Sequence, residues 1–541
     1  MSIPSSWFFT RRADWRPLII LIIIVAASVI SAAMFLPQQT LWVDETTQMS
    51  GLTLNPVEVV SWLTSGKEAN QYGFGVPPDR MPPLSYWLGW GWSALWGLSE
   101  TAMRWLGVVL IAISVGVIFA TAYKVWGLGA ATAAGFLFGL SPNVLITAVE
   151  IRAYPLFLLL ATASYWFFTR ILAQPDKYHW QHLVGLVLCL ILAMYTHFFG
   201  LVLAGALLTA GLLMVWYAKG RCWPIIISIG LIGIAVLGLI PFVLNAFSVS
   251  DGAAADKNYF YGIARLLYRL FVHPTMGVSQ VVVGIAAVSA AILGLLAIPR
   301  KKDNYVQQGI WLALAVGFVT VVTANFVFST FGAVAPHYNL WMLPGVNLLL
   351  AGGLAVIFQQ SLRKLAIVAA VLLIGANGFA ASQLFIHGEY FAHGPHQKVA
   401  SLIRHLRPDR VSIVYENITD ENSGKSWGMI YFPLRYEFGS QLPQYLQKSD
   451  DVGNTDLLKL PERTLDVEPT TLTSPVVLVI RARSQKTKDI VWQIHHGDKA
   501  TPEGQVSQAF RQSERWKFIE SHLFVAFVAA DVVVFEQVVT P

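Results

Sequence analysis

The chain has 541 residues, of which 55% are hydrophobic and 13% are charged, well below the ~25% of charged residues in soluble proteins. Together with a mean hydropathy of +0.56, this composition excludes a disordered chain, a fibrous repeat and a purely soluble enzyme. The net charge of +6 does not indicate nucleic-acid binding, because the basic residues are placed as in a membrane protein. The chain is therefore interpreted as an integral membrane protein.

Eleven apolar runs approach the roughly 20 residues that a helix needs to cross a bilayer. In chain order they are 18–36, 104–123, 128–147, 155–173, 182–198, 200–218, 223–243, 278–298, 306–327, 340–359 and 365–385. The first run follows Arg11, Arg12 and Arg16 as in a signal peptide, but it is longer than the usual apolar core of one. We therefore predict an uncleaved anchor and eleven crossings.

The basic residues favour one side of these predicted spans. The N-terminus and alternate connectors hold thirteen bases and three acids, and the opposite connectors hold seven bases and nine acids. The positive-inside rule predicts a cytoplasmic N-terminus, and eleven crossings then place the C-terminus outside. The cytoplasmic connectors are too short for a nucleotide-binding domain. We therefore expect any chemistry outside, beginning with the long first outer loop, 37–103.

Residues 386–541 follow the last predicted span and have the mixed charge of a solvated domain. The β-branched runs Val411–Tyr415, Val476–Ile480 and Val532–Phe535 predict strands. Residues 396–406 and 504–514 predict helices. The sequence thus predicts a transmembrane domain (1–385) followed by an extracytoplasmic α/β or α+β domain (386–541), in which we find no catalytic motif.

Ionisable residues gather at the predicted outer ends of the spans. They are Asp44 and Glu45 after the first span, Arg80 in the same loop, Glu150 and Arg152 between spans three and four, His197 after span five, Arg265 and Arg269 on one face of a predicted helix, and His337 before span ten. Each has a simpler interpretation, as a solvated loop acid, a structural ion pair, an interfacial histidine or a solvated helix face. Ionised groups at a membrane edge are costly, however, and tend to mark function. At one common depth they would line a cavity suited to a substrate with a lipid tail, a phosphate and a polar head.

The order of these motifs resembles the bacterial polyprenyl-phosphate-sugar glycosyltransferases of the GT-C fold, a family that includes protein O-mannosyltransferases and lipid A aminoarabinose transferases. The matching segments are Asp44-Glu45, Pro82-Pro83-Leu84-Ser85-Tyr86, Ser141-Pro142 with Glu150-x-Arg152-x-Tyr154, Tyr195-Thr196-His197, and His337-Tyr338 with Leu343-Pro344. They cover about residues 18–385. Two positions depart from the family, Met81 in place of His or Lys and His337 in place of Arg.

This resemblance implies an α-helical polytopic protein of the bacterial cytoplasmic membrane, a polyprenyl-phosphate sugar donor, and a lipid, glycan or protein acceptor. It implies catalytic roles for Asp44 and Glu45, donor-phosphate binding by Arg152, Arg80, Tyr154, His337 and Tyr338, and substrate binding by Glu150, His197, Tyr86, Arg265 and Arg269. No nucleic-acid partner is expected. The two departures affect bases near the donor phosphate, so the donor's identity and a role for a divalent metal stay open.

The chemistry of a sugar phosphate donor predicts a more specific role for several of these residues. A sugar phosphate ester has a good leaving group that needs charge stabilisation, which Arg152 and Arg80 would supply. The acceptor hydroxyl needs a base, and Asp44 is the candidate in a single inverting displacement. Glu45 would position Asp44 or the acceptor, because neighbouring side chains in an extended segment point apart.

Two alternatives are a lipid-linked oligosaccharide polymerase or ligase and a lipid-sugar flippase or transporter. A polymerase or ligase would favour a large outer loop late in the chain. A transporter would place ionisable residues near the middle of the membrane, often at broken helices. The predicted spans are almost free of charge at their centres, which disfavours a transporter.

Overall fold

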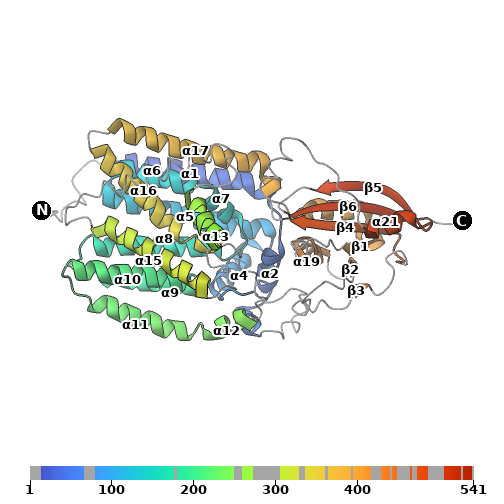
Figure 1. The fold of residues 1–541 in the computed structure, drawn as a ribbon, viewed down its shortest axis with the longest axis horizontal. Coiled ribbons are helices and arrows are strands. Elements are labelled where there is room, and N and C mark those ends of the chain that lie inside the picture. The colour runs from blue at the N-terminus through green and yellow to red at the C-terminus, as the bar shows by residue number, and fades with distance from the viewer. Residues whose placement is uncertain are drawn as a thin grey trace.

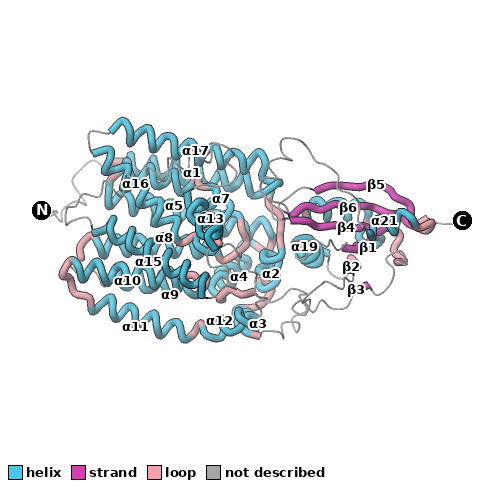
Figure 2. The backbone as a smooth tube through the Cα atoms, in the orientation of Figure 1, coloured by secondary structure: helices cyan, strands magenta, loops and turns pink. Residues whose placement is uncertain are grey.

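The computed structural model consists of a helical part and a smaller part that contains a β-sheet (Figure 1). The structure describes residues 14–65, 79–175, 180–248, 259–271, 305–327, 335–359, 363–391, 394–415, 428–438, 441–447, 464–465, 472–484, 505–524 and 528–538. The start of α1 and the described strands lie at opposite ends of the long axis. Figure 2 shows the described strands together at the C-terminal end, beyond the helices.

The helical part is a bundle with α5 near its centre. Its helices are α1 (Arg16–Phe35), α2 (Val43–Gly51), α3 (Pro56–Thr64), α4 (Leu84–Trp96), α5 (Glu100–Trp126), α6 (Leu128–Gly139), α7 (Pro142–Val149), α8 (Tyr154–Leu172), α9 (Trp180–Thr196), α10 (Gly200–Tyr217), α11 (Trp223–Leu237), α12 (Ile240–Ser248), α13 (Tyr259–Phe271), α15 (Tyr305–Val327), α16 (Met342–Gln359) and α17 (Arg363–Phe391), with the 3₁₀ turns η1 (Leu36–Gln38) and η4 (Pro336–Asn339). Helix α5 packs against α1, α6, α7, α8 and α16. The connectors on either side of α7 are thereby held against this central helix.

Six of the described helices are long and apolar enough to cross a membrane, and the number rises to eight if two bent pairs each form one span. The six are α1, α5, α8, α10, α15 and most of α17. Helices α9 and α16 are apolar but shorter. The predicted run 278–298 lies outside the described residues. The predicted membrane protein is confirmed, whereas the count of eleven spans is not.

The two bent pairs, α6–α7 and α11–α12, each turn by 56°, where the sequence predicts one straight run. The first bend has a local cause: Pro142 begins α7, and Ser141 before it is extended, with φ −63° and ψ 125°. Proline lacks an amide donor and disfavours helical backbone at the residue before it. Broken helices are typical of transporters, but neither pair contains an Asp, Glu, Lys or Arg residue.

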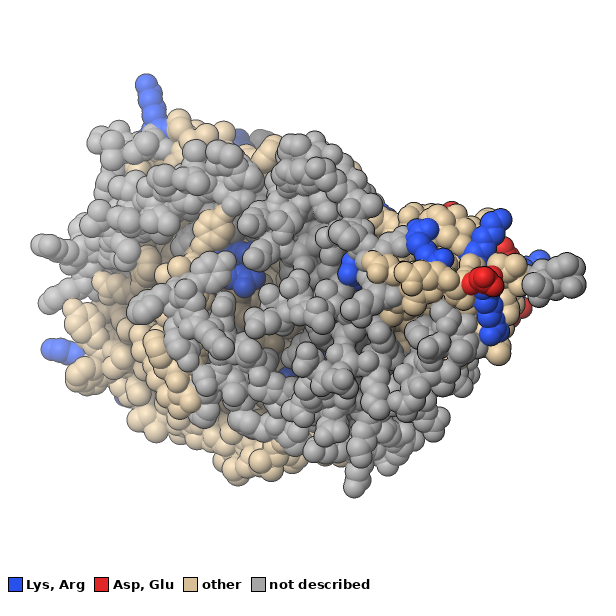
Figure 3. All heavy atoms as spheres, turned by 45° about the vertical axis from the view of Figure 1, so that its right-hand side comes forward, with Lys and Arg blue, Asp and Glu red and all other residues tan. Residues whose placement is uncertain are grey.

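The outer surface of the bundle is apolar. Helix α11 alone exposes Ile226, Ile227, Leu231 and Ile234. On the face seen in Figure 3, the described surface of the helical part carries few charged side chains, and those of both signs gather over the sheet. Such a surface is expected where lipid, and not water, is the solvent.

The smaller part, residues 394–538, is called here the C-terminal unit. It contains α18 (His396–Leu406), β1 (Val411–Tyr415), α19 (Gly428–Phe438), β2 (Gln444–Gln447), β3 (Thr464–Leu465), β4 (Val476–Ser484), α21 (Gln505–Gln512), β5 (Trp516–Phe524) and β6 (Val528–Gln537). The strand order is β3-β2-β1-β4-β6-β5. Strands β3, β2, β1 and β4 run parallel to one another, and β6 is antiparallel to both β4 and β5.

Helices cover both faces of this sheet. Ile413 of β1 packs in one apolar cluster with Val399 of α18, and the next residue, Val414, packs in another cluster with Phe510 of α21. This alternation is the period of two that a strand buried on both sides requires. The predicted unit of mixed helices and strands, α/β or α+β, is confirmed, and the sheet is covered by helices on both faces. The predicted domain boundary at 385/386 falls inside α17, next to its non-helical residue His387.

Candidate active site

The predicted catalytic pair, Asp44 and Glu45, lies on the first turn of α2. Trp42 before the helix is extended, with φ −133° and ψ 174°, and the helix begins at Val43. The prediction that Asp44 and Glu45 lie in an extended segment is therefore wrong. Carboxylates in a first turn interact favourably with the helix dipole. Successive side chains on a helix are about 100° apart, so the two carboxylates still face different neighbours.

Asp44 faces Arg152, from the connector between α7 and α8. Nη2 of Arg152 lies 3.6 Å from Oδ2 of Asp44, and Nη1 donates to the Asp44 carbonyl oxygen at 3.1 Å. Nη1 also binds Oδ2 of Asp79 at 2.9 Å. The Arg152 and Asp79 side chains are 3% and 6% exposed, whereas that of Asp44 is 42% exposed. A buried cation thus sits between one buried and one accessible carboxylate.

Asp79 was not among the predicted site residues. Its Oδ2 accepts a hydrogen bond from the Tyr86 hydroxyl at 2.8 Å, and its Oδ1 accepts one from the Arg80 amide at 2.8 Å. It therefore ties the loop before α4 to Arg152. Its place beside Arg80 in a proline-rich loop is the sequence feature that could have marked it.

The electrostatics of this cluster follow from burial and close charges. Burial alone would lower the pKa of Arg152, but the carboxylates of Asp79 and Asp44 raise it above the ordinary value. Burial and then the Asp79 carboxylate raise the pKa of Tyr86 well above its ordinary value. Arg152 therefore stays a cation, and Tyr86 stays a hydrogen-bond donor, throughout the physiological pH range.

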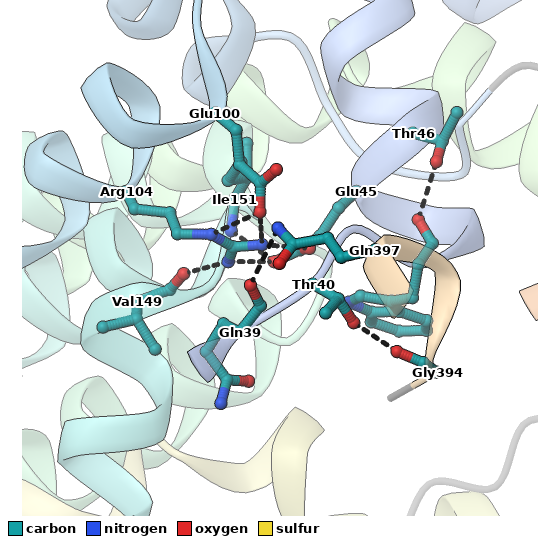
Figure 4. A network of polar contacts seen from close by, with 11 residues as sticks. Gln39, Thr40, Glu45, Thr46, Glu100, Arg104, Val149, Ile151, Gly394 and Gln397 are labelled. Atoms are coloured by element: carbon teal, nitrogen blue, oxygen red, sulfur yellow. Dashed lines mark hydrogen bonds and ion pairs between the residues drawn. The ribbon is translucent and has the colours of Figure 1, made fainter. Parts of the chain in front are cut away.

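Glu45 faces Arg104 of α5 (Figure 4). Nη1 and Nη2 of Arg104 each donate to one oxygen of the Glu45 carboxylate at 2.9 Å, and both side chains are 2% exposed. Oε1 of Glu45 also accepts from the Ile151 amide at 2.9 Å. Arg104 further donates to the Val149 carbonyl and, at 2.8 Å, to Glu100. Arg104 was not among the predicted site residues, although it lies one helical turn after Glu100.

Four other candidates form a ring cluster beside Arg152. Ring centroids lie 5.4 Å apart for Tyr154 and His197, 6.0 Å for Tyr154 and His337, and 5.8 Å for His197 and Tyr338. Nδ1 of His197 accepts from the Phe199 amide at 3.1 Å. The structure therefore brings together residues from three separate connectors, as their predicted common depth requires.

Arg80 and Tyr338 connect this ring cluster to Asp44 electrostatically. Burial and then the Asp44 carboxylate raise the pKa of Tyr338, while the cations of Arg152 and Arg80 oppose the rise. The Arg80 residue itself is exposed. Asp44, Arg152, Arg80 and Tyr338 therefore share one electrostatic environment.

Glu150 and Arg152 line a cavity together with Gln48 and Ser85, and its remaining wall is mostly apolar. The apolar residues come from α4, α5, α8 and the connector before α8; they are Leu88, Met103, Leu106, Gly107, Leu110, Ile151, Pro155 and Leu156. Nε of Arg152, Oε1 of Gln48 and Oγ of Ser85 are buried and have no hydrogen-bond partner among the described residues. The cavity thus combines unused polar atoms with an apolar wall.

Arg265 and Arg269 lie on α13, which packs against η4, α15 and α16. Their spacing of four places them on one helix face, while Leu266 is fully buried. The Arg269 carbonyl accepts from the Asn143 amide group at 2.8 Å. His273, which follows Arg269 by another four residues in the sequence, lies outside the described residues. Helix α13 therefore lies beside the His337 and Tyr338 turn.

The described part of the chain contains no group of three or more His, Cys, Asp or Glu side chains placed to hold a metal ion. Asp44 and Asp79, the two acids nearest to Arg152, are both turned toward its guanidinium. These residues do not fit a divalent-cation site.

Solved structures of other proteins are similar to this chain, whereas comparisons by sequence find no match. No protein-family model and no curated protein matches the chain. The apo crystal structure of ArnT from Cupriavidus metallidurans is similar with a TM-score of 0.51 and 13% identity, over 95% of this chain and 97% of that one. The same protein bound to undecaprenyl phosphate gives a TM-score of 0.50 and 12% identity, over 98% and 99% of the two chains.

A third similar structure is an oligosaccharyltransferase from Archaeoglobus fulgidus. It gives a TM-score of 0.45 and 12% identity, over 81% of this chain and 62% of that one. The ArnT match extends over nearly the full length of both chains, the sheet-containing part included. The chain therefore has the GT-C fold of ArnT, a helical membrane part followed by a C-terminal unit.

Proposed function

We propose that the protein is an inverting membrane glycosyltransferase, which moves a sugar from a polyprenyl-phosphate donor to a hydroxyl of a lipid, glycan or protein acceptor. The observation that carries this proposal is the cluster of Asp44, Arg152 and Asp79. It places an accessible carboxylate, 42% exposed, within 3.6 Å of a buried guanidinium. The shared fold with ArnT, one structure of which holds undecaprenyl phosphate, supports the class of donor.

Arg152 is suited to hold the donor phosphate and to stabilise it as it leaves. Its guanidinium is held in place by Asp79, so its orientation is set before the substrate arrives. Its Nε has no partner among the described residues, and Asp44 contacts it more distantly than Asp79 does. A phosphate oxygen can therefore gain a charge-assisted hydrogen bond here without displacing Asp79. Arg80, Tyr154, His337 and Tyr338 would complete the phosphate site.

Asp44 is suited to accept the proton of the acceptor hydroxyl. In a single displacement, the acceptor oxygen forms a bond to the anomeric carbon as its proton passes to Asp44. The bond between that carbon and the phosphate oxygen breaks at the same time, and the electron pair leaves on the polyprenyl phosphate. One displacement inverts the anomeric configuration. Arg152 stabilises the phosphate charge that appears in this step.

The site is proposed to face the outside of the bacterial cytoplasmic membrane. The excess of bases at the N-terminus and in alternate connectors supports a cytoplasmic N-terminus. The start of α1 and the C-terminal unit lie at opposite ends of the bundle (Figure 1), and α2 packs against α19 of that unit. A reporter that works only outside the cytoplasm should be active after Pro541 or within 244–277 and silent within 299–304. The reverse pattern would contradict this orientation.

The transfer itself is tested with the purified full chain in lipid nanodiscs. A panel of undecaprenyl phosphates carrying different hexoses and pentoses is offered with lipids, glycans and proteins extracted from a bacterial envelope. We expect one donor to release undecaprenyl phosphate while one acceptor class gains the mass of that sugar. The anomeric configuration of the product, read by NMR, should be opposite to that of the donor. Failure of every donor to be consumed, in a protein that remains folded, would contradict the proposed function.

A further inference from the structure

The start of the C-terminal unit is joined to the segment that leads into α2. The Thr40 hydroxyl donates to the Gly394 carbonyl, and Nε2 of Gln397 donates to the Gln39 carbonyl at 3.5 Å. The buried His396 side chain lies against the backbone of Leu41. Three successive residues before Trp42 are thus held by residues 394–397, as Figure 4 shows for Gln39 and Thr40.

Gln397 also reaches the buried ion pair behind Asp44. Its side chain also lies beside the Glu100 carboxylate, whose charged form it favours, and Glu100 binds Arg104 at 2.8 Å. Arg104 in turn holds Glu45 through two hydrogen bonds. A carboxylate only accepts hydrogen bonds, so the Gln397 amide group is the donor. A continuous chain of polar contacts therefore runs from α18, through α5, to the first turn of α2.

The formal charges of Glu45, Glu100 and Arg104 explain why a hydrogen-bond donor is needed beside Glu100. Glu45 and Glu100 share one guanidinium, so the cluster of Glu45, Glu100 and Arg104 has a formal charge of −1. The Glu100 side chain is 25% exposed, whereas those of the other two are 2% exposed. A partly buried carboxylate that is short of cations is stabilised by neutral donors. The Gln397 amide supplies one to Glu100, and the Ile151 amide supplies one to Glu45.

Three successive residues in the first turn of α2 each contact a different part of the protein. Val43 packs against the apolar core of the C-terminal unit, Asp44 faces Arg152, and Glu45 is bound by Arg104. We infer that Gln397 is a positioning residue for transfer, through which the C-terminal unit holds Asp44 in its reactive place. This inference rests on the proposed function, since it concerns the placement of the proposed base.

Three substitutions at this position separate hydrogen-bond donation from simple packing. Gln397→Lys keeps a long side chain with a donor for Glu100, Gln397→Ala removes the donor, and Gln397→Glu replaces it by a third carboxylate. We expect kcat to decrease in the order parent and Lys, then Ala, then Glu, with a loss of about tenfold for Glu, because small misplacements of a reacting group are costly. The KM for the donor should change little, because Arg152 and its partners stay in place.

A second measurement does not depend on activity. Hydrogen exchange of the amides of α2, followed by mass spectrometry on the full chain in nanodiscs, should be faster in Gln397→Glu and Gln397→Ala than in the parent and in Gln397→Lys. Gln508→Ala is the matched control, since it removes the same side chain, exposed like that of Gln397, from α21 on the opposite face of the sheet. It should leave both kcat and exchange unchanged.

The outcomes distinguish the two proposals. If the parent transfers sugar and Gln397→Glu matches it in kcat and in exchange, the inference is overturned. If Lys and Glu lower kcat equally, Gln397 serves packing and the inference is likewise overturned. If the parent consumes no donor, the proposed function fails. In that case, exchange of α2 in the same variants still decides whether Gln397 holds this helix.

Discussion

Two buried arginines, each between two carboxylates, lie on either side of the first turn of α2, and they differ in how completely they are paired. Arg104 binds both oxygens of Glu45 and also Glu100 and a backbone carbonyl. Arg152 binds Asp79 closely, stands 3.6 Å from an accessible Asp44, and keeps a buried Nε without a partner among the described residues. Arg104 and its partners, in which the cation is fully paired, are called here the closed cluster. Arg152 and its partners, in which the cation keeps hydrogen-bonding capacity, are called the open cluster.

This difference in pairing decides which of the two ion-pair clusters is able to bind a ligand and take part in a reaction. A saturated, buried pair holds its elements together, and losing one partner leaves an uncompensated charge. An open pair keeps hydrogen-bonding capacity and exposed carboxylate surface for a ligand. The sequence places Asp44 and Glu45 side by side, but the structure gives one to each cluster. The following predictions test this division of roles.

The largest expected effect is on turnover, from Asp44→Asn in the open cluster. A general base contributes about 10²–10⁴-fold to rate, and the change is nearly isosteric, so donor binding should persist. Transfer and binding are both measured with a polyprenyl-phosphate sugar. Asp14→Asn, the same change at a residue whose side chain is 62% exposed, should be neutral. Normal transfer by Asp44→Asn would remove Asp44 from the role of base.

Arg152→Ala should lower turnover by about 10²–10³-fold, the usual loss when one charge-stabilising donor is removed. Arg152→Lys keeps the charge but loses the planar fork, so partial activity is expected. Both variants are compared at equal amounts of folded protein in the membrane. Arg404→Ala, which removes an ion-paired but 60% exposed arginine, is the control. Unchanged transfer by Arg152→Ala would make Arg152 only a structural partner of Asp79.

The closed cluster should respond mainly in stability. Arg104→Leu leaves the Glu45 carboxylate buried without its cation, which costs about 3–5 kcal/mol for a buried pair. Thermal unfolding of the purified protein measures this loss. The double variant Arg104→Leu with Glu45→Leu should recover part of it, because the stranded charge is removed as well. If the single variant unfolds like the parent, Arg104 does not hold α2.

The sequence predicts the fold well because hydropathy and strand patterns are local properties. Run 306–327 corresponds to α15 and residues 411–415 to β1. The site is predicted only in part, because its ion pairs join distant residues. Arg104 and Glu45 are 59 positions apart and Arg152 and Asp79 are 73 apart. An arginine at the start of an apolar span does require a buried acid partner, but it does not say which acid.

The smallest expected effect is a pH dependence of stability that belongs to His396, at the junction of α18 with Leu41. Burial, and then the cation of Arg104, lower the pKa of His396 to about 3. Between its ordinary pKa of about 6.5 and that value, the unfolded chain binds a proton that the folded chain does not. Stability is therefore lost as pH falls below about 6.5, by roughly 2 kcal/mol at most between pH 7 and 5.

His396→Asn removes this proton linkage, so its unfolding temperature should fall less than that of the parent between pH 7 and pH 5. His405→Asn alters an exposed histidine of the same helix and should follow the parent. His396 lies against the segment that leads into α2. The measurement therefore also reports on how firmly the Arg104 side of this helix is held. Equal pH dependence in all three proteins would mean that His396 takes up its proton without disturbing this junction.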